Sequence, residues 1–139
     1  MPINKKILNL NEMFEVFDNP IDKYSQLIDL GKNNPGISNK NKNDSNRIFG
    51  CSSLAWVRTH TKNNKFYIST DSDTFIVKGL LHILKIIIDG EDKEDIIQLN
   101  IEIILNAIGL GNAITSQRTN GFISALDKIK NQIGEIDGK

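Results

Sequence analysis

The segment TFIVKGLLHILKIIID, residues 74–89, contains the most apolar run of the chain, Gly79 to Ile88. Its large apolar side chains would wrap most of the circumference of a helix, which is typical of a helix buried in a core. Asp71-Ser72-Asp73 offers acceptors for the free amides at the start of this helix, and Gly90 ends it. The sequence therefore predicts a central buried helix. Gly79 costs up to about 1 kcal/mol relative to Ala in a helix, which indicates that another backbone packs closely against it.

Two antiparallel strands are predicted before this helix, at Ser53 to Thr61 and Phe66 to Thr70, with a polar turn at residues 62–65. One face of the first strand carries Leu54, Trp56, Arg58 and His60, and the other carries Ala55, Val57, Thr59 and Thr61. The alternation alone does not decide which face is covered. Because a two-stranded ribbon is marginal in water, a third strand is needed or a helix must pack on it. Arg47 to Phe49 is the nearby candidate for a third strand.

Helical periodicity predicts the elements around this hairpin. A short helix around Ile7 to Phe17 is followed by one over Pro20 to Lys32, which Asn19 caps. Later helices are expected around Asp92 to Leu99, around Ile101 to Ile108, and from Thr115 or Ser116 towards the C-terminus. The predicted fold class is α+β: a small antiparallel sheet of about three strands packed with helices. Residues 1–139 fit a single domain, with a mobile polar loop at about 33–46.

Charge and composition exclude several function classes. Seventeen basic and seventeen acidic side chains give a formal net charge of zero, so the chain has no general attraction for nucleic acid or anionic lipid. The apolar run at residues 79–88 is too short to span a bilayer, and the N-terminal residues are too polar for a signal-peptide core. One cysteine and two histidines do not suggest a metal site. We therefore expect a soluble, cytoplasmic protein without a metal, whose partner is another protein or a small molecule.

The stretch NRIFGCSSLAW, residues 46–56, holds the single cysteine, Cys51. A lone thiol can neither form an internal disulfide nor ligate a metal by itself, so any role must come from its own reactivity. Gly50 permits a positive φ, and small serines follow the cysteine, which predicts a tight turn leading into a strand. The alternative is a buried cysteine that acts as a small apolar side chain. The local residues favour neither interpretation.

Three further side chains are candidates to support the thiol. Arg47 or Arg118 is a candidate cation that would favour the thiolate form. Arg118 also falls in the first turn of the last predicted helix, where the helix dipole disfavours a cation. It is therefore either an exposed arginine without a role or one that grips a carboxylate or a partner, with Asp71 or Asp73 as the first candidates. Trp56 either covers the thiol or is a core aromatic residue.

Three segments together resemble the SufE family of sulfur-acceptor proteins, which includes CsdE. They are Asn46-Arg47-x-x-Gly50-Cys51-x-Ser53-x-x-Trp56-Val57, then Asp71-Ser72-Asp73 followed by Ile76-Val77-Lys78-Gly79-Leu80, and finally Thr115-x-x-Arg118-x-Asn120-Gly121. The segments occur in the family's order, and the likeness covers roughly residues 20–133. The resemblance implies an α+β fold of the kind that IscU-type scaffolds also use.

The resemblance also implies a function. Family members accept sulfur as a persulfide from a pyridoxal-phosphate (PLP) dependent cysteine desulfurase of the SufS or CsdA type, stimulate that enzyme, and pass the sulfur to an iron–sulfur scaffold complex. Cys51 matches the persulfide-forming position, and Arg118, Asp73, Gly50, Trp56 and Arg47 match supporting or partner-binding positions. PLP belongs to the desulfurase, so no cofactor of its own is expected, and a homodimer is left open. The alternative is a regulatory binding module of a desulfurase, with a structural cysteine.

Overall fold

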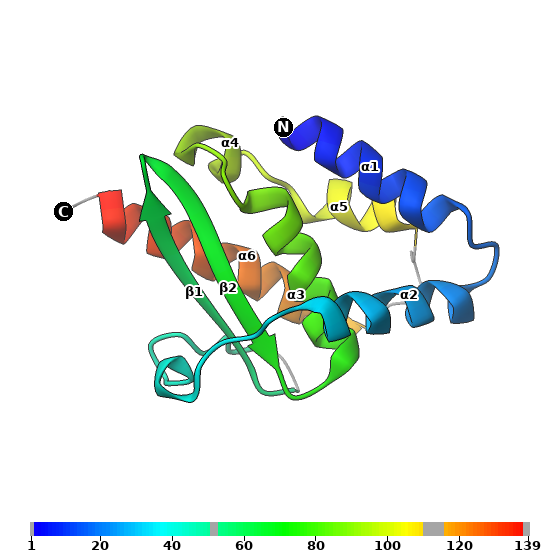
Figure 1. The fold of residues 1–139 in the computed structure, drawn as a ribbon, viewed down its shortest axis with the longest axis horizontal. Helices are drawn as coiled ribbons and strands as arrows, with labels where there is room; N and C mark the ends of the chain where they lie inside the picture. The colour runs from blue at the N-terminus through cyan, green and yellow to red at the C-terminus, as the bar shows by residue number, and fades with distance from the viewer. Residues whose placement is uncertain (1, 51–52, 110–115, 138–139) are drawn as a thin grey trace.

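The computed structural model describes residues 2–50, 53–109 and 116–137 (Figure 1). Its elements in chain order are α1 (Ile3–Glu15), α2 (Pro20–Asn33), a 3-10 turn (Asn39–Asn41), β1 (Ala55–Lys62), β2 (Lys65–Ser72), α3 (Phe75–Ile88), α4 (Lys93–Ile97), α5 (Ile101–Ile108) and α6 (Ser116–Asp137). Helix α3 lies in the middle and packs against α1, α2, α6 and β2. The predicted α+β class is confirmed.

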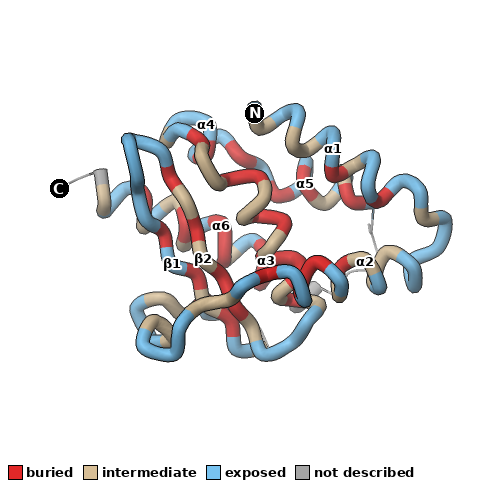
Figure 2. The backbone as a smooth tube through the Cα atoms, in the orientation of Figure 1, coloured by how far each residue is buried: buried red, intermediate tan, exposed pale blue. Residues whose placement is uncertain are grey.

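The central buried helix is also confirmed. Eight residues of α3 are buried. Figure 2 shows buried residues, in red, along this helix and on the elements around it. A side-chain carbon added at Gly79 would collide with the carbonyl oxygen of Leu27 in α2, and one added at Gly31 would collide with the carbonyl oxygen of Phe75. Helices α2 and α3 therefore cross in backbone contact through one glycine each. The sequence predicted the close approach at Gly79 but not the matching glycine.

Strands β1 and β2 form the predicted hairpin, with Ala55 opposite Ser72 and Lys62 opposite Lys65. Asn63 and Asn64 turn the chain with φ values of 56° and 64°, as in the type I′ turns that suit the twist of a hairpin. Helix α6 packs on one face of β1, and this buried face carries Ala55, Val57 and Thr59. The alternate residues of β1 face outwards. The structure thus selects the face that the sequence left undecided.

The expected third strand at Arg47 to Phe49 is wrong as a strand. Arg47 makes one isolated antiparallel bridge with Trp56, flanked by bonds from Ile48 N to Ala55 O and from Val57 N to Asn46 O, both 2.8 Å. A side chain of α6 takes the next place along this edge. Gln132 Oε1 accepts from Thr59 N at 3.0 Å, and Gln132 Nε2 donates to Val57 O at 3.3 Å. The amide group of Gln132 thus replaces a peptide of the missing strand, and the sheet in the described part of the chain has two strands.

The polar segment at 33–46 is tied to the rest of the fold at several points. Asn34 Nδ2 donates to Thr70 Oγ1 at 2.8 Å, Ile37 N donates to Asp71 Oδ2 at 3.0 Å, and Lys42 forms an ion pair with Asp71 at 3.2 Å. The mobility of this segment stays a prediction, but its path is set by these contacts. It delivers the chain to the bridge between Arg47 and Trp56.

The remaining helices differ from the prediction mainly at their ends. Helix α1 begins at Ile3, after Pro2, and α4 is a single short helix of five residues. Asn19 caps α2 as predicted, since its Oδ1 accepts from Asp22 N at 2.9 Å. Thr115, one of the two expected caps of α6, lies outside the described residues, and Ser116 is the first residue of that helix. None of the helices in the described part of the chain has both the length and the apolar character of a membrane span.

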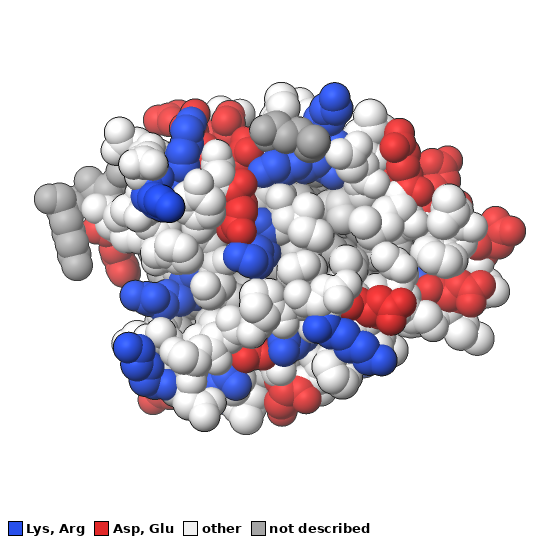
Figure 3. Space-filling model, viewed as in Figure 1, with Lys and Arg blue, Asp and Glu red and all other residues white. Residues whose placement is uncertain are grey.

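The surface charges follow the balanced composition. On the face shown in Figure 3, blue and red side chains are interspersed over much of the surface, and acidic side chains gather at the end of the molecule where α1 is followed by α2. Several charges of opposite sign are paired, among them Lys6 with Glu91 at 2.9 Å and Lys85 with Asp89 at 2.8 Å. This face therefore carries no extended basic surface of the kind that binds nucleic acid.

Candidate functional site

Cys51 lies outside the described residues, so the site is defined by the chain that enters and leaves it. Gly50 has a φ of +93°, in the region that only glycine adopts readily, which confirms the predicted positive φ. A side-chain carbon at Gly50 would lie 2.8 Å from Ser124 Oγ of α6. On the other side, Ser53 Oγ lies 3.4 Å from Thr74 Oγ1, just before α3. We call the segment from Phe49 to Ser53 the cysteine turn. Its described ends, at Gly50 and Ser53, lie next to Ser124 of α6 and next to Thr74, just before α3.

The residues that lead into this turn alternate between the core and the solvent. Ile48 is buried, with 2% of its surface exposed, whereas Phe49 is 60% exposed. The guanidinium carbon of Arg47 lies 5.2 Å from the centre of the Phe49 ring, within the range of a cation–π contact. Arg47, a predicted cation for the thiol, therefore stacks on an exposed aromatic residue in the segment leading to Cys51. Phe49 was not among the predicted supporting residues, and its place directly before Gly50 and Cys51 is the sequence signal that could have drawn attention to it.

Trp56 lies on the outer face of β1 and is half-buried, so it is not a core aromatic residue. The ammonium group of Lys42 lies 5.3 Å from the centre of its ring. Lys42 also pairs with Asp71, so this lysine joins the polar segment at 33–46 to the outer face of the hairpin. A role of Trp56 in covering Cys51 stays an expectation.

Asp71 is the most heavily bonded carboxylate near the site. It is 6% exposed and accepts hydrogen bonds from Ile37 N at 3.0 Å and Ser72 N at 2.8 Å. Lys42 Nζ and Lys78 Nζ lie 3.2 and 3.4 Å from its oxygens. Burial alone would raise the pKa of Asp71, but the Ile37 amide, Lys42, the Ser72 amide and Lys78 together hold it below its ordinary value. Asp71 is therefore ionised and fixes the polar segment to the hairpin.

Arg118 lies beneath the same region, on the first turn of α6. Its guanidinium carbon is 6.0 Å from the centre of the Tyr24 ring of α2. It also lines a small apolar cavity of about 10 Å³, together with Ile48 and Ala55 and with Val77, Leu80, Leu81, Gly121 and Phe122. Lys42 and Lys78, not Arg118, form the described ion pairs of Asp71. Arg118 therefore borders the same cavity as Ile48, and the expectation that it grips Asp71 or Asp73 stays a prediction.

Asp73 is the last of the predicted supporting residues, and His60 is the histidine nearest to Cys51 in the sequence. Asp73 is exposed and its backbone N–H donates to Leu54 O at 3.1 Å, which closes the start of the hairpin. His60 stacks on Tyr67, with ring centres 5.9 Å apart. It lies five residues along β1 from Ala55, about 17 Å at the usual strand rise, so it cannot reach the chain at Gly50. In the three described ranges, no group of three or more His, Cys, Asp or Glu side chains could hold a metal ion.

A family model for SufE, described as an Fe-S metabolism associated domain, matches residues 8–133. The chain belongs to the SufE family. It is 32% identical over 123 residues to an uncharacterized SufE-like protein of Rhizobium etli, covering 86% of this chain and 83% of that protein. It is 31% identical over 128 residues to the cysteine desulfuration protein SufE of Wigglesworthia glossinidia brevipalpis, covering 90% of this chain and 88% of that protein.

The fold has a solved counterpart. The solution structure of a hypothetical protein from Thermus thermophilus superposes with a TM-score of 0.78 and covers 96% of this chain and 97% of that one. The two sequences are 17% identical, so this match supports the fold alone. Together the comparisons confirm the resemblance that the three segments carry and connect this SufE-family chain with Fe-S metabolism.

Proposed function

We propose that this protein accepts sulfur from a PLP-dependent cysteine desulfurase as a persulfide on Cys51, stimulates that enzyme, and passes the sulfur to iron–sulfur cluster assembly. One observation carries the proposal: the sole cysteine of a SufE-family chain directly follows Gly50, which has a φ of +93° and rests against α6. The name of the relative from Wigglesworthia glossinidia brevipalpis, a cysteine desulfuration protein, supports the same reaction.

The proposed step is a thiol–persulfide exchange without net oxidation. The Cys51 thiolate attacks the outer sulfur of the persulfide on the desulfurase cysteine, and a new S–S bond forms while the old one breaks. The desulfurase cysteine leaves as a thiolate, and Cys51 carries the persulfide. The acceptor takes the outer sulfur from Cys51 by the same exchange. PLP remains in the desulfurase, and this chain needs no cofactor of its own.

The side chains around Cys51 act by position and charge. Arg47 stacks on Phe49, and Arg118 borders the same cavity as Ile48, so each is placed near the chain that leads to the thiol. A nearby cation lowers the pKa of a thiol and raises the thiolate fraction. Gly50, Trp56 and Asp73 would shape the surface that receives the partner. The cytoplasm, which keeps a single cysteine reduced, is the compartment we propose.

Intact-mass measurement after incubation with a desulfurase and cysteine, without reductant, tests the proposal. The wild-type protein should gain one sulfur atom that maps to Cys51. Cys51→Ser should gain none and should leave desulfurase turnover at the rate of the enzyme alone, because a serine hydroxyl is not ionised at neutral pH. Gly134→Ala is a matched control on the exposed side of α6, where nothing lies within 4 Å of an added carbon, and it should gain sulfur as wild type does.

The competing function is a regulatory module that binds a desulfurase through the same surface and carries a structural cysteine. It predicts an unchanged mass in the same incubation, with undiminished binding and with stimulation by Cys51→Ser equal to that by wild type. A homodimer is compatible with either function, and sedimentation of the free protein decides it.

A further inference from the structure

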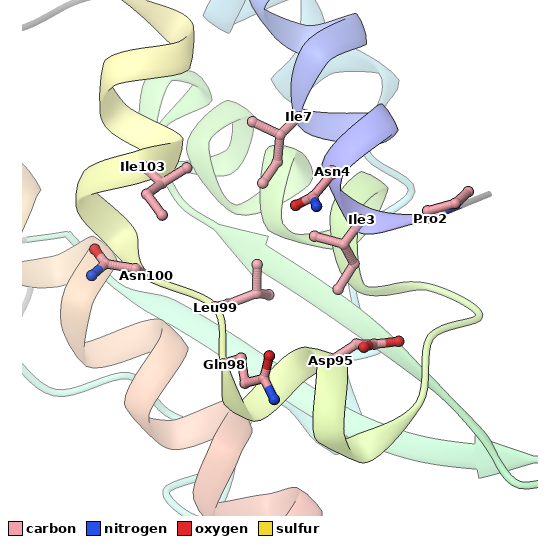
Figure 4. Close-up of a pocket in the computed structure, with 9 residues that line it drawn as sticks. All are labelled: Pro2, Ile3, Asn4, Ile7, Asp95, Gln98, Leu99, Asn100 and Ile103. Atoms are coloured by element: carbon pink, nitrogen blue, oxygen red, sulfur yellow. The ribbon is translucent and has the colours of Figure 1, made fainter.

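A hollow of about 260 Å³ lies between the N-terminal end of α1 and the connection from α4 to α5 (Figure 4). It is lined by Pro2, Ile3, Asn4, Ile7, Asp95, Gln98, Leu99, Asn100 and Ile103. In Figure 1 the start of α1 and helix α4 lie at the opposite edge of the molecule from the start of β1, where the chain leaves the cysteine turn. The hollow is therefore a separate site from the one already described.

Aliphatic side chains line one part of the hollow, and polar side chains line the rest. Ile3 and Ile7 are one helical turn apart on α1, and Figure 4 shows them opposite Leu99 and Ile103 across the hollow. Leu99 forms a buried base with 7% of its surface exposed, whereas Ile103 is 56% exposed. An isoleucine that borders a hollow and remains more than half exposed has apolar surface that a ligand can cover. The volume is below the range usual for drug-sized ligands, so a single side chain is the fitting occupant.

Among the described residues that line the hollow, Asp95 is the one that carries a charge. Two nearby acidic residues have partners, since Glu91 pairs with Lys6 at 2.9 Å and Asp92 pairs with Lys65 at 2.6 Å. Within the described residues, no cation lies at ion-pair distance from Asp95. Asn4, Gln98 and Asn100 add amide groups around it. The site thus combines an apolar base with a negative rim that also offers hydrogen bonds.

We propose that this hollow is a docking site for a segment of a partner protein that inserts an aliphatic side chain next to a lysine or arginine. The aliphatic group would lie on Ile3, Leu99 and Ile103, and the cation would pair with Asp95. The side-chain amides suit the backbone of a peptide, and the lone carboxylate disfavours phosphate and other anions. Because the hollow lies across the molecule from the start of β1, a bound segment does not cover that end of the strand. This inference is independent of the sulfur-transfer proposal.

Titration of the isotope-labelled full-length protein with three capped dipeptides, followed by amide chemical shifts, tests the site. Acetyl-Leu-Lys-amide should give saturable shifts confined to the start of α1 and to residues 95–103. Acetyl-Leu-Glu-amide should bind about twofold to fivefold more weakly, the range expected from one exposed ion pair. Acetyl-Gly-Lys-amide, which lacks the apolar anchor, should give no saturable shifts.

Two variants separate the charge of Asp95 from general acidity. Asp95→Asn should remove the preference for lysine over glutamate, whereas Glu94→Gln, an exposed neighbour that does not line the hollow, should keep it. Absence of saturable shifts with the leucyl-lysine peptide would overturn the proposal. So would an undiminished preference in Asp95→Asn, or shifts centred on Gly50. Shifts at the hollow that grow with protein concentration alone would assign it to a second copy of the chain and overturn it as well.

Discussion

Gly50→Ala should destabilise the protein through backbone strain at the entrance to the cysteine turn. A φ of +93° is outside the range that residues with a side-chain carbon adopt readily, and such strain costs about 1–3 kcal/mol. The added carbon would also lie 2.8 Å from Ser124 Oγ, a contact that the serine can relieve by rotating its hydroxyl. The strain is therefore the larger effect. We expect a loss of about 1.5–3 kcal/mol in the free energy of unfolding.

The double variant Gly50→Ala/Ser124→Ala separates the two contributions. After loss of the hydroxyl, the nearest atom of residue 124 would be its side-chain carbon at 3.7 Å, an ordinary contact. The second substitution should therefore recover only the smaller, steric part, less than about 1 kcal/mol. Ser124→Ala alone provides the fourth corner of the cycle. Urea unfolding followed by the fluorescence of Trp56, the single tryptophan, gives all four free energies.

Two results would refute this reasoning. A loss below about 0.5 kcal/mol in Gly50→Ala would mean that the chain accommodates a side chain at this φ without strain. Complete recovery in the double variant would mean that the contact with Ser124, and not the backbone conformation, selects glycine here.

Three further changes test the fold around the site. Gly79→Ala should lower the free energy of unfolding by about 1–3 kcal/mol because α2 and α3 must separate, whereas Gly134→Ala, in open space, should raise it by about 0.5–1 kcal/mol. Urea unfolding measures both changes, and changes of the same sign in the two variants would contradict the close crossing of α2 and α3. The pKa of Asp71 in the folded protein lies below its ordinary value of 3.8, so the ionised carboxylate stabilises the fold above that value, and this stabilisation is lost as the pH falls through the folded pKa. Urea midpoints measured from neutral to acid pH should therefore fall less steeply in Asp71→Asn than in wild type. Gln132→Ala should cost about 1–2 kcal/mol and speed hydrogen exchange at Thr59 N, and unchanged exchange there would show that the edge of β1 does not depend on the glutamine.

Sequence reasoning succeeded where the physical cause is local. The apolar residues of α3 dictate a buried helix whatever surrounds it. The polar residues 62–65 separate two strand patterns, so the hairpin turn could be placed there, and Asn63 and Asn64 adopt positive φ in it. Asn19 followed by Pro20 specifies the start of α2, and the bond from Asp22 N to Asn19 Oδ1 is the result. Each of these predictions needed only a few neighbouring residues.

The predictions failed or remained incomplete where partners are distant in sequence. The sequence left open whether a third strand or a helix completes the hairpin, and no local pattern indicates that Gln132 of α6 would bond the edge of β1. In the sequence, nothing distinguishes Gly31 from other glycines in helices. Its role as a contact point for α3 is visible only in the structure. Lys42 lies in a polar segment without periodicity, so its pairing with Asp71 could not be foreseen. These contacts are set by tertiary packing.

The arrangement around Asp71 explains how a sulfur carrier of the proposed kind can work without a neighbouring base. An exchange between thiols needs a thiolate and an open approach, but no second catalytic group. The remaining requirement is a fixed path for the chain that carries the cysteine. Asp71 binds Ile37 N and Lys42 before the turn and lies at the end of β2, so it ties the incoming polar segment to the hairpin. Gly50 then seats the chain on α6. Within the second segment shared with the SufE family, Asp71 therefore contributes position rather than chemistry, in keeping with its buried and paired carboxylate, whereas Asp73 is exposed.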